Sequence, residues 1–150
     1  MNVYETIRKR RTVRRFRQDP IPREILEKLI DAARLAPSAA NLQPNEYIVV
    51  DEPGLLPRVF STLRWAGYIA PGGNPPEGEK PVVYIIVLTN KEKTKISGVS
   101  DAAAAIENIL LTAREEGIGS CWLGSIERSK LQQILAIPGH CPVDSVIALG

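Results

Sequence analysis

Apolar and polar residues follow one another along the chain at spacings typical of helices and strands. Residues 22–36 carry apolar side chains at helical spacing behind a proline, and residues 101–117 do so over a longer run. Ser100 and Asp101 are expected to cap the longer helix, and Gly117 is expected to end it. Further, shorter helices are predicted over residues 2–9, 55–63 and 127–135.

Short runs of apolar and β-branched residues predict four strands. The clearest is VVYIIVLT at residues 82–89, and the others lie at residues 46–51, 118–125 and 143–150. Because helices separate these strands, the chain is expected to fold as a mixed α+β structure, with helices covering the sheet. Residues 68–81 contain four prolines and three glycines and are expected to form a surface loop.

The composition indicates a folded, globular protein. Its 150 residues fit one domain, with 44% hydrophobic and 24% charged residues. No stretch has the roughly 20 consecutive apolar residues of a membrane span. The first residues, MNVYETIRKR, lack the apolar core of a signal peptide. We therefore expect a single domain over residues 1–150, no membrane partner and a cytoplasmic location.

Cysteine and histidine are too few to indicate a metal centre. Cys121, Cys141 and His140 are the candidate ligands, and their spacing matches no zinc motif. A three-ligand site is the alternative to two packed thiols and a loop histidine. We expect the packed thiols, and no metal.

Positive charge is concentrated near the start of the chain. Seven of the ten residues from Arg8 to Arg17 are basic, whereas the rest of the chain has 12 basic and 17 acidic residues. The cluster has three interpretations: a nucleic-acid-binding arm, a solvated face with salt bridges to acidic residues, or a phosphate site. The phosphate site would use Arg10, Arg11, Thr12 and Arg14.

A second candidate stretch, PSAANLQPN, is a polar loop bracketed by prolines. Ser38, Asn41 and Gln43 present hydroxyl and amide groups that can bind the edge of a planar heterocycle. The alternative is a turn in which these groups satisfy the backbone of the loop itself.

A third stretch, GIGSCWLGS, contains glycines that allow close approach of the backbone. Gly117 and Gly119 flank Ile118, and Gly124 also allows close approach of the backbone. The stretch is not the dinucleotide fingerprint, and the chain has no P-loop, no nucleophile elbow and no convincing pairing of Cys with His for nucleophilic catalysis. If the protein is an enzyme, a bound cofactor is therefore expected to carry its chemistry.

The order of these stretches resembles the nitroreductase family of flavoproteins over nearly the whole chain. Along the sequence they are RRTVRRF, an amphipathic helix, APSAANLQPN, a strand and AAAAIENILLTAREEGIGSCWLG. The resemblance implies an α+β fold with a central, mostly antiparallel sheet flanked by helices. It also implies noncovalent FMN and a homodimer with flavin sites at its interface. The electron donor would be NADH or NADPH, and the acceptor a small molecule such as a nitroaromatic or a quinone. The flavin N5 would carry the chemistry, so no catalytic side chain is expected. A member of this family is also expected to have no nucleic-acid partner.

The resemblance assigns the cofactor contacts to three groups of residues. The family's Arg-Arg-Ser-x-Arg motif is matched by Arg10, Arg11, Thr12 and Arg14. Within it, Arg10 and Thr12 would hold the phosphate and ribityl end, and Arg14 would reach the pyrimidine side of the ring. The loop that meets the flavin from the partner subunit in many members is matched by Pro37, Ser38, Asn41 and Gln43. The segment whose backbone faces the flavin near N5 is matched by Trp122, Leu123 and Gly124.

The chain departs from the family pattern at two places. Asn45 stands where members often have tryptophan, which puts the packing beneath the loop in doubt. The chain ends at ALG, where relatives usually continue and carry a basic residue that contacts the flavin phosphate.

The small side chains of residues 102–105 would permit close helix approach at a dimer interface, with ordinary core packing as an equal alternative.

Two other functions remain as alternatives. One is a protein of the same fold that binds FMN without turnover. The other is a nucleic-acid binder that uses the basic N-terminal arm.

Overall fold

The protein folds around one antiparallel sheet, seen in a computed structural model that describes residues 2–69, 72–96 and 98–150. The strand order is β1–β2–β4–β3, and each strand is antiparallel to its neighbours. The strands are β1 (Asn45–Val50), β2 (Val83–Thr89), β3 (Ser120–Leu123) and β4 (Val143–Leu149). The predicted α+β class with a mostly antiparallel sheet is confirmed.

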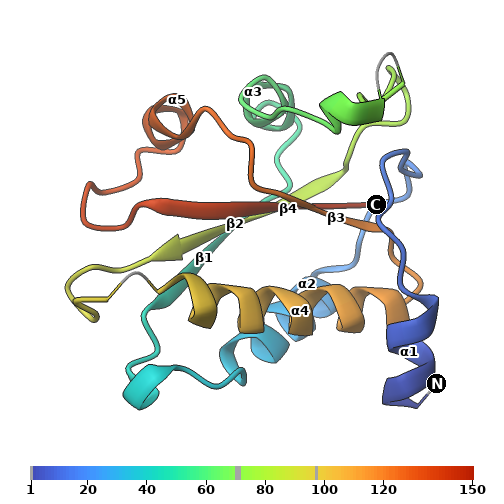
Figure 1. The fold of residues 1–150 in the computed structure, drawn as a ribbon. Coiled ribbons are helices and arrows are strands. Elements are labelled where there is room, and N and C mark those ends of the chain that lie inside the picture. Colours follow the sequence, from blue (N-terminus) through green and yellow to red (C-terminus); the bar gives the residue numbers. More distant parts are fainter. Residues whose placement is uncertain (1, 70–71, 97) are drawn as a thin grey trace.

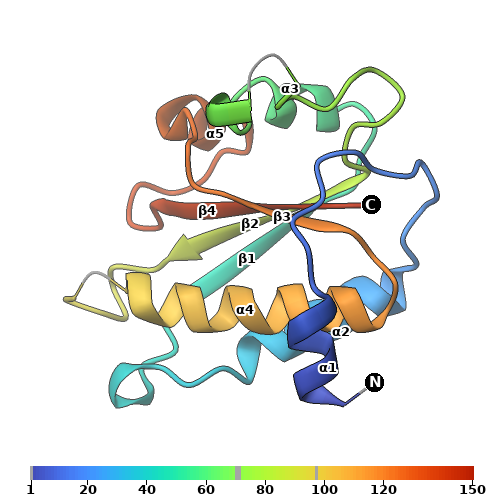
Figure 2. The ribbon, with the colours of Figure 1, turned by 45° about the vertical axis from the view of Figure 1, so that its right-hand side comes forward.

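Helices cover both faces of the sheet (Figure 1). On one face lie α2 (Arg23–Arg34) and α4 (Val99–Glu115), and on the other lie α3 (Leu56–Phe60) and α5 (Arg128–Ile134). The short α1 (Val3–Lys9) lies beside the C-terminal end of α4 (Figure 2), where the Thr6 hydroxyl donates a hydrogen bond to Glu115 at 3.0 Å.

The central strand β2 explains why its sequence is a continuous apolar run. All seven of its residues are buried because helices cover it on both sides. Tyr84, Ile86 and Leu88 pack into the core beneath α3 and α5. Val83, Ile85 and Val87 pack into the core formed with α2 and α4.

The long helix begins and ends at glycines. Gly98, at φ 71°, precedes the first helical residue, and no side chain caps the helix, so the prediction of Ser100 and Asp101 as caps is wrong. The reason is that the helix begins at Val99, which places both residues inside its first turn. At the other end Gly117 adopts φ 76°, and the Ile118 N–H donates to the Ala113 carbonyl at 2.8 Å. The predicted glycine C-cap is therefore confirmed.

Several predicted elements are present but shorter than their patterns. The helix predicted over 55–63 has five residues, and the strand predicted over 118–125 has four. The strand begins at Ser120, and Gly119 just before it exchanges hydrogen bonds with Gly150. The loop predicted over 68–81 begins with the end of a 3-10 helix, Gly67–Ile69, and its residues 70 and 71 lie outside the described residues.

The alanines of α4 pack against the core. Ala102 and Ala105 are 0% and 2% exposed and belong to the cluster with α2 and the sheet, whereas Ala103 and Ala104 are half-buried. Ordinary core packing thus accounts for the first pair. Among the residues that the structure describes, no helix is long and apolar enough to cross a membrane.

Candidate functional site

The residues from Arg8 to Arg17, here called the basic segment, run from the end of α1 along the open edge of the sheet. Thr12 forms a parallel bridge with Ser120 of β3, and the Val13 N–H donates to the Ser120 carbonyl at 2.9 Å. Further along, Phe16 is 3% exposed, and its ring meets Trp65 edge-on at 6.2 Å between centroids. Because backbone bonds and a buried aromatic hold it, this segment is a fixed part of the fold.

One pocket gathers the basic segment, α4 and β3. Its volume is about 320 Å³, and it is lined by Arg10, Thr12, Arg14, Glu107, Leu110, Ser120 and Trp122. The structure thus brings members of two of the three predicted groups into one pocket, whereas Arg11, Leu123 and Gly124 do not line it. Two guanidinium groups and a hydroxyl are hydrogen-bond donors suited to a phosphate or another anionic group.

The remaining arginines differ in what they contact. Arg11 turns back on its own segment and donates to the carbonyls of Arg8 and Arg10, each at 2.8 Å, so it does not line the pocket. Arg15 forms an ion pair with Glu79 at 2.9 Å. The salt-bridged interpretation therefore fits Arg15, whereas the anion-site interpretation fits the arginines in the pocket.

Arg14 has a partner that the sequence motifs did not indicate. Its Nη2 donates to the hydroxyl of Tyr68 at 2.8 Å, and its guanidinium carbon lies 5.8 Å from the centre of the Tyr68 ring. Tyr68 comes from the proline- and glycine-rich loop and is 81% exposed. This tyrosine holds Arg14 in place without taking part in the core.

Strand β3 presents its side chains alternately to the pocket and to the core. Trp122 is 42% exposed, and its Nε1 donates to the Ser145 hydroxyl at 2.8 Å, which in turn donates to Asp144 at 2.7 Å. Leu123 is 5% exposed and belongs to the core beneath α3 and α5, so only its backbone is available to a ligand. The neighbouring Gly124 is exposed.

The glycine expected to permit close approach does so to the chain itself. A Cβ on Gly119 would lie 2.9 Å from the Gly150 carbonyl oxygen and 2.9 Å from Cγ1 of Val13. Gly119 therefore lets the basic segment lie against β3. A Cβ on Gly124 would meet nothing within 4 Å.

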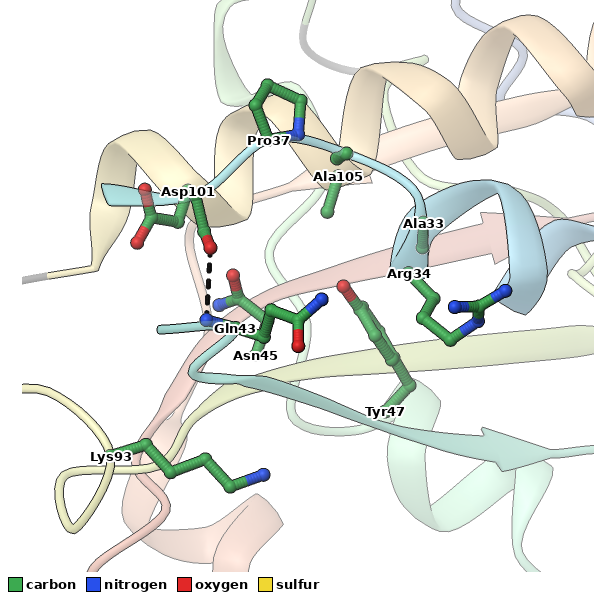
Figure 3. Close-up of a pocket in the computed structure, with 11 residues that line it drawn as sticks. Ala33, Arg34, Pro37, Gln43, Asn45, Tyr47, Lys93, Asp101 and Ala105 are labelled. Atoms are coloured by element: carbon green, nitrogen blue, oxygen red, sulfur yellow. Dashed lines mark hydrogen bonds between the residues drawn. The ribbon is translucent and has the colours of Figure 1, made fainter. Parts of the chain in front are cut away.

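The polar loop lines a second pocket, of about 220 Å³ (Figure 3). Figure 3 shows Asp101 and Ala105 of α4 on one side and Gln43, Asn45 and Tyr47 on the other, where burial raises the pKa of Tyr47 to about 12. Of the predicted loop residues, Pro37, Ser38 and Gln43 line this pocket and Asn41 does not.

The loop is held in an unfavourable backbone conformation by hydrogen bonds. Ala40, Asn41 and Gln43 have φ of 50°, 54° and 50°, in the left-handed region that costs a residue other than glycine about 1–2 kcal/mol. The Ser38 hydroxyl accepts from the Gln43 N–H at 3.0 Å (dashed in Figure 3), so this serine satisfies the backbone of its own loop. Asn45, in the place of the expected tryptophan, donates to the Leu88 carbonyl at 3.2 Å.

Asp101 ties this loop to α4. Its Oδ1 accepts a hydrogen bond from the Ala39 N–H at 3.0 Å. The residue is 8% exposed, and its Oδ2 is buried without a partner among the described residues. Sequence reasoning missed this contact because an aspartate before an apolar helix is also the usual signal of an N-cap.

The two pockets occupy different parts of α4. The loop pocket reaches Asp101 and Ala105, whereas the arginine pocket reaches Glu107 and Leu110. One copy of the chain therefore does not bring the loop and the arginines into one pocket.

The cysteines do not form a metal site. Cys121 and Cys141 are free and buried. Burial raises the pKa of the Cys121 thiol, and the charge of Arg14 partly opposes this rise. Over the described ranges 2–69, 72–96 and 98–150, no group of three His, Cys, Asp or Glu side chains is placed to hold a metal ion.

Comparison with known proteins gives consistent results. The family model described as Nitroreductase family matches residues 7–71 and 75–150. A protein of Archaeoglobus fulgidus, named provisionally as an NADH dehydrogenase/NAD(P)H nitroreductase, is 36% identical over 148 residues, which cover 94% of this chain and 80% of that protein.

Solved structures agree. The crystal structure of a nitroreductase family protein from Clostridium novyi NT superposes with a TM-score of 0.85 at 32% identity, covering 100% of this chain and 84% of that one. A provisionally named nitroreductase from Desulfovibrio desulfuricans, solved in complex with FMN, gives a TM-score of 0.81 at 27% identity, covering 100% of this chain and 86% of that one. The chain accordingly belongs to the nitroreductase family.

Proposed function

We propose that the protein is an FMN-dependent oxidoreductase that takes electrons from NADH or NADPH and passes them to a small acceptor such as a nitroaromatic or a quinone. The observation that supports this most directly is the pocket in which Arg10, Thr12 and Arg14 face Trp122 at the edge of the sheet. The proposal treats residues 1–150 as one FMN-binding domain.

The side chains present fit this cofactor. The Arg10 guanidinium and the Thr12 hydroxyl would bind the phosphate and ribityl end through charge-assisted hydrogen bonds. Arg14 would place positive charge beside the ring, and a cation there stabilises the reduced, anionic form. Ser145 fixes the Trp122 indole at 2.8 Å, which keeps the backbone of β3 in position. Bound FMN would supply the hydride and electron chemistry, so the chain needs to bind and orient rather than to donate protons.

A homodimer completes the proposed site. Because the polar loop and the arginines line different pockets of one copy, Pro37, Ser38, Asn41 and Gln43 would meet the flavin held by the other copy. The chain also exposes apolar side chains on α1 that a second copy would cover: Val3 at 72%, Tyr4 at 68% and Ile7 at 50%.

The test is anaerobic titration of the FMN-loaded protein with each nicotinamide, followed by the flavin absorbance. We expect one FMN per chain, bleaching by NADH or NADPH, and reoxidation by a quinone. Arg10→Ala and Arg14→Ala should each weaken FMN binding by about tenfold or more, as expected for a lost charged hydrogen bond. Arg15→Ala is the matched control, because Arg15 is paired with Glu79 outside the pocket.

Other outcomes separate the alternatives. A protein that takes up no FMN would refute the proposal. Bound FMN that neither nicotinamide reduces would indicate a binding protein without turnover. Binding to nucleic acid that weakens steeply with salt and depends on Arg15 and Arg17 would instead indicate a nucleic-acid binder.

A further inference from the structure

Asp101 uses its carboxylate in a way that its position in the helix does not require. An aspartate in the first turn of a helix commonly accepts hydrogen bonds from the free N–H groups of that helix. Here Oδ1 accepts instead from the Ala39 N–H, in a loop far away in sequence, at 3.0 Å. Asp101 is 8% exposed whereas Ala39 is exposed, so this bond is partly buried.

The loop needs support of this kind. Residues 39–43 are all exposed, so little packing fixes them, and three of them have left-handed backbones. Ser38 supports the far end through Gln43, and the Ala39 N–H at the near end is held by Asp101. Since α4 packs firmly into the core through Ala102 and Ala105, Asp101 transfers the rigidity of the helix to the loop.

We propose that Asp101 is a positioning residue of the cofactor site, which holds the left-handed loop 38–43 in the conformation that meets the flavin of the other subunit. The proposal rests on the proposed function for its link to FMN. Its structural part, the control of the loop by the bond from Ala39 to Asp101, stands on this chain alone.

The environment of Asp101 Oδ2 makes Asp101→Asn a suitable conservative variant. Because Oδ2 has no partner in the described part of the chain, Asp101→Asn keeps the acceptor for Ala39 and breaks no other hydrogen bond that the structure shows. Asp101→Ala removes the acceptor. Ala39→Pro removes the donor from the loop side, and Ser38, at φ −138° and ψ 155°, already has the extended backbone that precedes proline.

The experiment measures two properties of wild type, the three variants and the double variant of Asp101→Ala with Ala39→Pro. Amide hydrogen exchange of the peptide covering residues 40–44 reports the loop, and fluorescence titration reports FMN affinity. We expect Asp101→Ala to speed exchange and weaken FMN binding by about tenfold each, the effect of one lost hydrogen bond, and Asp101→Asn to stay within about threefold of wild type. Ala39→Pro should weaken FMN binding similarly, and the double variant should be no weaker than either single one, because both remove the same bond.

A control separates positioning from general stability. Val59→Ala creates a cavity in the other core, beneath α3, and should lower the melting temperature while leaving loop exchange unchanged. Unchanged exchange in Asp101→Ala would overturn the proposal, as would additive losses in the double variant. Faster exchange with wild-type FMN affinity would overturn the link to the cofactor. Failure of the wild type to bind FMN would refute the proposed function, and the exchange data would still decide whether Asp101 controls the loop.

Discussion

The contact between the basic segment and β3 can be tested by adding one methyl group at Gly119. A Cβ there would lie 2.9 Å from the Gly150 carbonyl oxygen, 2.9 Å from Val13 Cγ1 and 3.2 Å from Val13 Cβ. Unstrained carbon atoms stay about 3.5–4.0 Å from such neighbours. The Val13 side chain and the backbone at Gly150 therefore both have to move when Gly119→Ala is made.

The size of the effect follows from this crowding. Overpacking by one group costs about 1–3 kcal/mol. Since one of the crowded atoms belongs to the backbone, we expect about 2 kcal/mol, or roughly 4–8 °C in melting temperature for a chain of this length. Val13 is the neighbour of Thr12 and Arg14, so the shift reaches the arginine pocket. We expect FMN binding to weaken by about tenfold, which corresponds to about 1.4 kcal/mol.

Urea unfolding and flavin fluorescence titration measure the two effects separately. Gly124→Ala is the control for stability alone, because a Cβ there meets nothing within 4 Å and its φ lies outside the left-handed region. It should stay within about 0.5 kcal/mol of wild type in stability. If Gly119→Ala is as stable as Gly124→Ala, the basic segment does not lie against β3.

Three further predictions concern the loop, the tyrosine and the acid stability. Tyr68→Phe removes the hydroxyl that accepts from Arg14 and should weaken FMN binding by about three- to tenfold with no change in melting temperature; wild-type affinity would contradict it. Ala40→Gly relieves a left-handed alanine but adds entropy to the unfolded chain, so urea unfolding should show a gain of up to about 1 kcal/mol, and any loss would count against the strain. The hydrogen bond from Asn90 lowers the pKa of Glu46 in the folded state below its ordinary value of 4.5. This carboxylate therefore stabilises the fold above pH 4.5, and the stabilisation is lost as the pH falls through the folded pKa of Glu46. Glu46→Gln should make the free energy of unfolding depend less on pH in the acid range. An unchanged pH dependence would refute this role of Glu46.

The sequence predicted most of the fold because its strongest patterns describe buried faces. The apolar run of β2 and the helical spacing of α2 and α4 are visible without a structure, since the core selects those residues. The ends of elements were less predictable. The start of α4 depends on the left-handed Gly98, and the polar residues after it look like caps although one of them serves the loop.

The sequence motifs indicated several residues that line the arginine pocket but not the contacts that support them. Arg10, Thr12, Arg14 and Trp122 line one pocket, as their motifs suggested. Arg11 belongs to the same motif, but hydrogen bonds to nearby carbonyls turn it away from the pocket. Which arginine faces inward depends on short-range bonds of this kind and on long-range partners such as Tyr68, and neither leaves a pattern in the sequence.

The pairing of Thr12 with Ser120 also determines when the site forms during synthesis. The arginines are synthesised before β3, the strand edge that orders them. Until that edge emerges, Thr12 and Val13 lack the backbone partner that orders them in the folded protein. Under the proposed function, FMN is therefore retained only after β3 has been translated, and a ribosome stalled before Ser120 holds a chain that lacks this strand edge.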